Sequence, residues 1–195
     1  MPGVRALTYD ELELIAQSFR GPMATRNKAL FLVQYYTGRR ITQTLSLHLG
    51  DIVTSAGQIV THIHYKRDIV KGKIEGQNVF LHPKARPSIV EWVEKLRYIG
   101  RMTSECWLFP RQGVDKPLTR TGAYQVYKKT FKRTGINGRL GTHSLRKLYA
   151  RNVYKTSGND IRATQVALGH KSLANTAAYI GIEAEQVDEI ILAAL

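Results

Sequence analysis

A histidine and an arginine three positions apart, His143 and Arg146, are the first residues of this sequence whose types and spacing suit chemistry. They lie in Gly-Thr-His-Ser-Leu-Arg at 141–146, where Thr142 has the residue type of a helix N-cap. Residues three apart on a helix share a face, so the two side chains should point the same way. Near a helix start they can bind one phosphate group together. The alternative is a chance pair at this spacing.

A second histidine, His170, is followed nine residues later by Tyr179. On one unbroken helix this spacing places the two side chains on opposite faces. Gly169, a helix-ending residue type, and Ser172, an N-cap type, instead predict a turn between two helices. That turn would let both side chains face one pocket. The alternative for Tyr179 is a half-buried packing residue.

Two pairs of basic residues lie beside expected breaks in the chain. Arg39 and Arg40 directly follow a glycine, at the expected start of a short helix whose free N–H groups favour an anion. Lys71 and Lys73 lie in an expected hairpin connection, from which a lysine can protonate a leaving oxygen. Taken alone, each pair is better explained as solvated surface charge.

The ordered set of motifs resembles the tyrosine recombinase, or phage integrase, family. The motifs are Thr-Gly-Arg-Arg-Ile-Thr-Gln-Thr-Leu-Ser-Leu at 37–47, His-Ser-Leu-Arg at 143–146, and Leu-Gly-His at 168–170 followed by Tyr179. Each motif is weak alone, whereas their order and spacing together are specific. The resemblance extends from about Leu7 to Tyr179.

The resemblance implies catalytic roles for the matching positions. Arg40 and Arg146 would grip the scissile phosphate of a DNA strand, and Tyr179 would be the nucleophile. A tyrosine hydroxyl in water has a pKa near 10, so it needs help to lose its proton. His143 would give that help, and His170 would donate a hydrogen bond to the phosphate.

The resemblance also implies a lysine that protonates the departing 5′ oxygen. Lys71 fits this position best, Lys73 is a substitute, and Lys66 is a more distant one. The broken bond's energy would be kept in a 3′-phosphotyrosine, so a 5′ hydroxyl can reseal the strand. No cofactor or metal is expected, and the sequence has no acidic cluster of the two-metal kind. One departure stands out: the family often has an acidic residue where this chain has Gln43, and we expect tuning of activity rather than loss.

The charge of the chain points to a polyanionic partner. The 195 residues carry 29 Lys and Arg against 15 Asp and Glu, a formal net charge of +14. Nucleic acid is favoured over an anionic membrane or a merely basic surface, because no basic amphipathic helix and no membrane-length apolar run stands out. The resemblance implies that this nucleic acid is double-stranded DNA. The single cysteine fits a reducing, cytoplasmic setting in association with DNA. The residues expected to contact DNA outside the catalytic set are Arg39, Lys73, Lys128, Lys129, Lys132, Arg133 and Arg139.

The elements that must position these residues form a mainly α domain with a small antiparallel β-sheet near its middle, an α+β fold. A capping box at Thr8 to Glu11 begins the first helix. The patterns predict further helices at about 22–36, 41–49, 88–99, 119–134, 142–156, 159–168, 172–179 and 183–194. Strands are predicted at 58–65 and 77–81, and a third, short one at 107–109. We expect a lead-in at 1–6, a catalytic domain at 7–180 and a C-terminal helix at 181–195.

Other functions were weighed against DNA recombination. A catalytically silent DNA-binding regulator of the same fold would lack part of the motif set, which is present here. A relaxing enzyme of the type IB topoisomerase kind would share the chemistry without joining two DNA sites. The resemblance further suggests a homo-oligomer on DNA, up to a tetramer, in which the C-terminal helix docks on a neighbouring protomer; that helix could instead pack on its own domain.

Overall fold

The computed structural model describes residues 3–66, 76–114, 116–181 and 192. Twelve helical and strand elements fall within these residues. They are α1 (Tyr9–Gln17), α2 (Ala24–Thr37), α3 (Ile41–Leu45), η1 (Leu49–Asp51), β1 (His62–Tyr65), β2 (Gln77–Phe80), η3 (Pro83–Ala85), α4 (Arg86–Tyr98), α5 (Arg120–Thr134), α6 (Thr142–Thr156), α7 (Ile161–Leu168) and α8 (Leu173–Ile180). The predicted mainly helical fold is confirmed.

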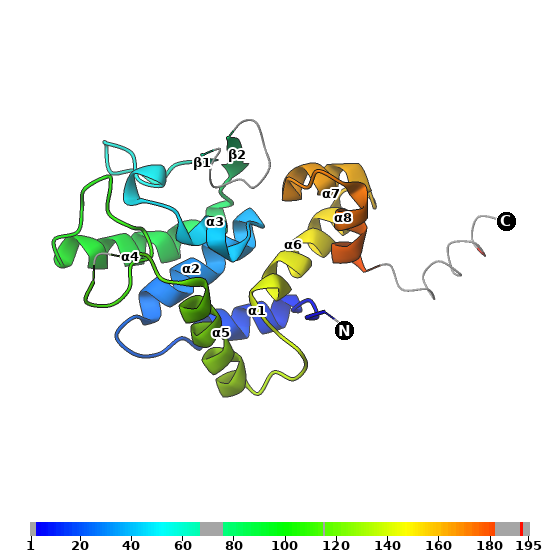
Figure 1. Ribbon diagram of the computed structural model, residues 1–195, viewed down its shortest axis with the longest axis horizontal. Helices are drawn as coiled ribbons and strands as arrows, with labels where there is room; N and C mark the ends of the chain where they lie inside the picture. The colour runs from blue at the N-terminus through cyan, green and yellow to red at the C-terminus, as the bar shows by residue number, and fades with distance from the viewer. Residues whose placement is uncertain (1–2, 67–75, 115, 182–191, 193–195) are drawn as a thin grey trace.

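Helix α2 runs through the middle of the molecule, where α1, α3, α4 and α6 pack against it (Figure 1). Its apolar residues include Leu30, Phe31 and Val33, which are completely buried. A helix that is apolar around most of its circumference has to be covered on several sides. The rings of Phe19, Phe31 and Tyr127 meet with centroids 5.3 to 6.4 Å apart, which joins α2 and α5 in one core.

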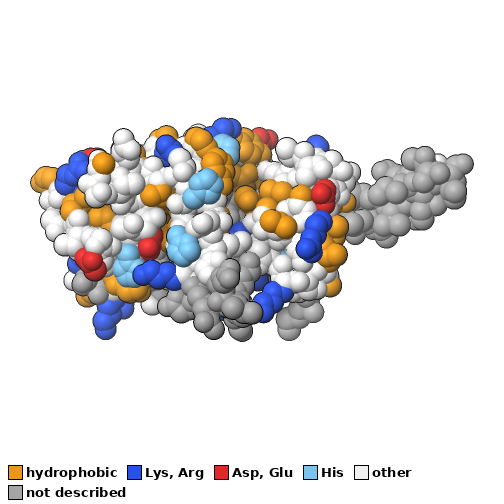
Figure 2. All heavy atoms as spheres, turned by 90° about the horizontal axis from the view of Figure 1, so that it is seen from above, with side chains coloured by type: hydrophobic (Ala, Val, Ile, Leu, Met, Phe, Trp, Pro, Cys, Tyr) orange, Lys and Arg blue, Asp and Glu red, His pale blue; other side chains and the backbone are white. Residues whose placement is uncertain are grey.

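The small sheet pairs β1 with β2 in antiparallel fashion, with His62 opposite Phe80 and Tyr65 opposite Gln77. Alternation along β1 buries Ile63 and Tyr65 and exposes His62 and His64. Figure 2 looks down on this end of the molecule and shows histidine side chains on the surface. The two predicted strands are therefore confirmed, although they are shorter than the sequence pattern suggests.

The prediction of a third strand at 107–109 is wrong, because these residues belong to no strand of the described structure. Trp107 makes only an isolated antiparallel bridge with His48, and Pro110 makes another with Pro117. Leu108 and Phe109 are completely buried. Their apolar side chains fill the core from an irregular segment, and a short apolar run does not by itself indicate which backbone conformation buries it.

Helices α6, α7 and α8 pack on one another at the right of Figure 1, and α6 reaches back to α2 and α5. α6 therefore connects the C-terminal helices to the rest of the domain. Its predicted range, 142–156, is confirmed. The helix starts at Thr142, so the N-cap is Gly141 rather than the expected Thr142.

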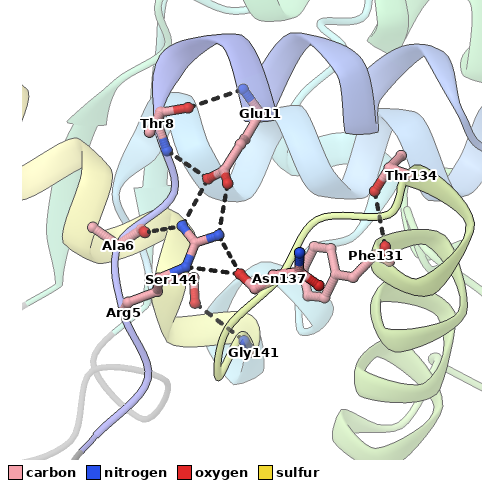
Figure 3. A network of polar contacts seen from close by, with 9 residues as sticks. All are labelled: Arg5, Ala6, Thr8, Glu11, Phe131, Thr134, Asn137, Gly141 and Ser144. Carbon is pink, nitrogen blue, oxygen red and sulfur yellow. Dashed lines mark hydrogen bonds and ion pairs between the residues drawn. The ribbon is translucent and has the colours of Figure 1, made fainter.

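The loop that leads into α6 is held by an arginine near the N-terminus (Figure 3). Arg5 forms an ion pair with Glu11 at 2.6 Å and donates to the backbone oxygen of Asn137. Thr8 and Glu11 form the expected capping box at the start of α1. These contacts tie the start of the described chain and α1 to the residues that precede α6.

A buried glutamine fixes the start of α6 from inside. Gln34 on α2 accepts a hydrogen bond from the hydroxyl of Tyr127 at 3.0 Å and donates one to the backbone oxygen of Thr142 at 2.9 Å. Both side chains are at most 1% exposed. One amide thus joins α2, α5 and the first turn of α6.

We expect Tyr127→Phe to lower the free energy of unfolding by about 1 to 2 kcal/mol, because the oxygen of Gln34 would remain buried without its donor. Urea denaturation measures this value. Tyr98→Phe is the matched control because the Tyr98 side chain is 92% exposed. Equal unfolding midpoints for the two variants would contradict the assigned role of the Gln34 contact.

Candidate active site

The turn between α7 and α8 brings the second histidine and the tyrosine together, as the sequence predicts. α7 ends at Leu168, Gly169 adopts the left-handed conformation with φ of 67°, and α8 begins after Ser172. The rings of His170 and Tyr179 then lie 5.2 Å apart between centroids. The two residues therefore face one pocket, which one continuous helix could not achieve.

The guanidinium of Arg146 lies at the centre of this site and is 1% exposed. It donates to the backbone oxygen of Gly38 and, at 3.0 Å, to that of Leu168. It also contacts the Nε2 atom of His170 at 2.8 Å. The α2 end, α6 and the α7–α8 turn thus converge on one side chain.

Gly38 makes this convergence sterically possible. It ends α2 in the left-handed conformation with φ of 63°. A Cβ atom at Gly38 would lie 2.4 Å from the ring of Tyr149, one turn after Arg146 on α6. Only glycine readily combines this backbone conformation with so close an approach to the ring of Tyr149. In this position the carbonyl of Gly38 accepts the hydrogen bond from Arg146.

Positive charge in the site has no carboxylate beside it among the described residues. Arg146 has no acidic partner there, and its Nε atom is buried without a hydrogen bond. Burial lowers the pKa of Arg146, and the charges of Arg39 and Arg40 lower it further. Burying a charge without a partner is costly, so an anion at this position would stabilise the arrangement.

The tyrosine hydroxyl lies within hydrogen-bonding distance of the first histidine. The Nδ1 atom of His143 is 2.8 Å from the hydroxyl oxygen of Tyr179. Burial lowers the pKa of His143, and the charges of Arg146 and Arg40 add to this effect. At this distance a neutral imidazole can accept the proton of the hydroxyl, as a general base must.

His170 is 8% exposed, and both of its ring nitrogens already have partners. Nε2 contacts Arg146, and Nδ1 lies 3.1 Å from the hydroxyl oxygen of Thr176. Burial, followed by the charge of Arg146, lowers the pKa of His170 to about 4. In this arrangement His170 holds Arg146 and presents no free N–H, whereas the resemblance implies a hydrogen bond to the phosphate.

Arg40 is exposed at the edge of this cluster, and its charge contributes to the lowered pKa values of both histidines. Its backbone N–H donates to Oε1 of Gln43 at 3.1 Å. Gln43 is 5% exposed and so caps the start of α3 without a negative charge. Gln43 thus supplies a hydrogen bond at this position but no negative charge.

The structure corrects the expectation that Arg39 contacts DNA. Arg39 is 2% exposed, and its guanidinium donates to Gln77 at 2.8 Å and to the backbone oxygens of Thr37 and Ala167. Its donors are used to join α2, β2 and α7. Adjacent arginines at a helix start point in different directions, so one faces the surface and the other the interior.

The remaining expected residues fall in two groups. Lys71 and Lys73 lie outside the described residues. The others are exposed, on α5 or in the loop after it: Lys128, Lys129, Lys132, Arg133 and Arg139.

The start of α5 lies near the site, because the charge of Arg120 contributes to the lowered pKa of His143. Lys128 lies eight residues further on, about 12 Å along the helix axis.

Sequence reasoning missed Thr176 and Tyr149. Thr176 is completely buried against His170, three residues before Tyr179 on α8. The spacing of three on a helix is the signal that places it on the face of the tyrosine. Tyr149 has the same relation to Arg146 on α6, and its ring closes the site behind Gly38.

Comparison with known proteins agrees with this arrangement. Residues 5–186 match the model of the phage integrase family. The chain belongs to the phage integrase family. Tyrosine recombinase XerD of Mycobacterium tuberculosis (strain CDC 1551 / Oshkosh) is 29% identical over 199 residues, a match that covers 95% of this chain and 59% of the relative.

Solved structures of family members share the fold. The XerA recombinase superposes with a TM-score of 0.76 at 21% identity, over 99% of this chain and 65% of that one. The XerH site-specific recombinase, in a post-cleavage complex with a palindromic difH substrate, gives 0.75 at 24% identity, over 95% of this chain and 51% of that one. This chain thus spans between half and two thirds of the length of these relatives.

We expect both site histidines to stay neutral at pH values where an ordinary histidine takes up a proton. The pKa values of both histidines in the folded protein lie below 6.5. Just below pH 6.5 the unfolded chain therefore binds more protons at these two residues than the folded chain does. Stability should therefore fall as the pH drops below 6.5, for His170 down to about 4. NMR titration of the ring protons, assigned with His143→Gln and His170→Gln, measures this. Midpoints near 6.5 for both rings would contradict the described site.

Proposed function

We propose that this chain is the catalytic domain of a site-specific tyrosine recombinase that cleaves and rejoins double-stranded DNA. The observation that carries the proposal is the 2.8 Å contact between His143 and the hydroxyl of Tyr179, beside the buried Arg146. A nucleophile, a neutral base and an unpaired cation are the groups that attack on a phosphodiester requires. The XerH relative bound to DNA after cleavage lends support to DNA as the substrate.

In the proposed reaction the oxygen of Tyr179 attacks the scissile phosphorus, and the proton of its hydroxyl passes to Nδ1 of His143. A bond forms between the tyrosine oxygen and phosphorus, and the bond from phosphorus to the 5′ oxygen breaks. The products are a 3′-phosphotyrosyl enzyme and a 5′ hydroxyl. The reverse attack by a 5′ hydroxyl rejoins a strand without an external energy source.

Arg40 and Arg146 supply the positive charge for this reaction. Charge builds on the non-bridging oxygens as the tyrosine attacks, and guanidinium groups that are already in place stabilise it without further reorganisation. Arg146 is held by two backbone carbonyls and by His170, so its position is fixed before DNA binds. With this charge in place, the proposed chemistry uses no metal and no other cofactor.

The proton for the departing 5′ oxygen is assigned to Lys71, with Lys73 as the alternative. Both belong to the connection between β1 and β2, outside the described residues. The exposed basic residues of α5 and its following loop, from Lys128 to Arg139, are proposed to contact the DNA backbone. Such contacts position a protein on DNA without reading its sequence. Lys and Arg side chains are also spread over the face seen in Figure 2.

Suicide DNA tests the nucleophile. A nicked duplex loses a short fragment after cleavage, so the covalent protein–DNA adduct accumulates and is seen on a denaturing gel. We expect adduct with the natural chain and none with Tyr179→Phe, because the phenyl ring has no oxygen to attack. Tyr98→Phe, at an exposed position, is the control.

The same experiment separates the alternatives. No adduct on any cognate site, together with DNA binding, would support a silent regulator. Adduct formation with relaxation of supercoiled plasmid, but without joining of two sites, would support a relaxing enzyme of the type IB kind.

We further propose that the protein acts as a homo-oligomer on DNA, up to a tetramer, in the DNA-associated part of the cytoplasm. A palindromic substrate, such as that of the XerH relative, presents two identical half-sites and suits a two-fold arrangement of protein. Segment 183–195, which contains Val187, Ile190 and Ile191, is the proposed contact with a neighbouring protomer. No helix of the described residues is long and apolar enough to cross a bilayer.

Deletion of residues 184–195 should weaken assembly on DNA while sparing cleavage of a single half-site. The reason is that the catalytic groups described above all precede residue 182. Native gel electrophoresis measures the complexes, and suicide DNA measures cleavage. Higher-order complexes unchanged by the deletion would contradict the role of this segment.

A further inference from the structure

Thr176 is a completely buried polar residue that none of the proposed catalytic steps uses. It lies on α8, and its hydroxyl oxygen is 3.1 Å from Nδ1 of His170. The same hydroxyl oxygen is 3.5 Å from the backbone oxygen of Ser172, one turn earlier, at the limit of a hydrogen bond. Its contact with the histidine is therefore the shorter of the two.

Other buried threonines of this chain show what an ordinary helical threonine does. Thr130 donates to the backbone oxygen of Val126 at 3.0 Å, and Thr164 donates to that of Asp160 at 2.9 Å. In both, the hydroxyl bonds to the carbonyl four residues earlier, a common local contact. Thr176 differs because its hydroxyl is closer to a side chain of another element than to its own helix.

The contacts of His170 identify which ring nitrogen carries the proton. The guanidinium of Arg146 has donors and no acceptor, so at 2.8 Å the Nε2 atom of His170 must be the acceptor. A neutral imidazole has one N–H, which is then on Nδ1. The hydroxyl oxygen of Thr176 lies where it accepts that N–H. The lowered pKa of His170 agrees with a neutral ring.

We propose that Thr176 is a positioning residue for the cleavage reaction: it accepts the Nδ1–H of His170 and so keeps Nε2 turned toward Arg146. The chain of contacts runs from Thr176 through His170 to the guanidinium that is assigned to the scissile phosphate. This inference rests on the proposed function, because its effect on rate is an effect on DNA cleavage.

The hydroxyl is required because each substitute fails in a definable way. Valine has nearly the shape of threonine but accepts no hydrogen bond, so the Nδ1–H would be buried without a partner. The ring can avoid this by moving its proton to Nε2. An Nε2–H would then face the N–H groups of Arg146, and the two donors would repel each other. Serine keeps the acceptor and should keep the arrangement.

The same contact also sets the position of the nucleophile. Thr176 and Tyr179 are three residues apart and share a face of α8. The Cζ atom of Arg146 lies 5.6 Å from the centroid of the Tyr179 ring. The hydrogen bond from His170 to Thr176 therefore holds α8 against the α7–α8 turn at the point from which the tyrosine extends.

The test compares Thr176→Val and Thr176→Ser with the natural chain, and uses Thr130→Val as the matched control on α5. Suicide DNA at saturating protein gives the rate of adduct formation. We expect Thr176→Val to be about tenfold slower, the effect of one lost hydrogen bond. Thr176→Ser should lie within about threefold of the natural rate, and Thr130→Val should not change it.

A second measurement reads the proton directly and needs no DNA. Two-bond proton–nitrogen NMR correlations of ¹⁵N-histidine-labelled protein show which ring nitrogen is protonated, and His170→Gln assigns the signal. In the natural chain we expect the proton of His170 on Nδ1, with a shift toward Nε2 in Thr176→Val. Thermal denaturation identifies any variant that fails to fold.

Several outcomes would overturn the inference. A proton on Nε2 of His170 in the natural chain contradicts it without any variant. Equal losses of rate in Thr176→Val and Thr176→Ser would assign the effect to packing, and an unchanged rate in folded Thr176→Val would remove the role in cleavage. If the natural chain forms no adduct at all while the proton is on Nδ1, the proposed function fails and the contact of Thr176 with His170 stands.

Discussion

The site depends on one constraint: a guanidinium buried with no carboxylate beside it among the described residues. Arg146 is held by the carbonyls of Gly38 and Leu168 and by a neutral histidine. These partners bind both terminal nitrogens of the guanidinium without neutralising its charge, and Nε stays buried without a hydrogen bond, so the charge is left for a ligand. Burial, followed by the charges of Arg146 and Arg40, lowers the pKa of both histidines and so favours their neutral form. Burying the charge of Arg146 destabilises the fold. The apolar core around α2 can offset this cost.

Much of the fold and most of the site could be predicted from residue types and spacing. The break at Gly169 and the N-cap at Ser172 were sufficient to place His170 and Tyr179 on one pocket, because helix periodicity excludes the alternative. The predicted ranges 119–134 and 142–156 agree with α5 and α6 to within one residue at each end. Spacing also placed His143 and Arg146 on one face of α6. In each case a local rule decided a local geometry.

The sequence was insufficient where the outcome depended on tertiary contacts. Arg39 and Arg40 are chemically identical neighbours, and only the packing of Gln77 and Ala167 determines that the first is buried. The residues at 107–109 are apolar because they fill the core, whatever their backbone conformation. Spacing places Thr176 on the face of Tyr179, but it does not reveal the contact with His170, since a threonine in a helix usually bonds to its own backbone. Its partner is visible only once α8 is placed beside the turn.

The bond between Arg146 and Gly38 has a consequence for how the protein becomes active during folding. It joins residues 108 positions apart, and the contact between His143 and Tyr179 joins residues 36 apart. Contacts between distant residues form only after the entropy of closing the intervening loops has been overcome, which favours their late formation. A newly made or partly folded chain therefore carries its net positive charge of +14 before the residues of the proposed active site come together.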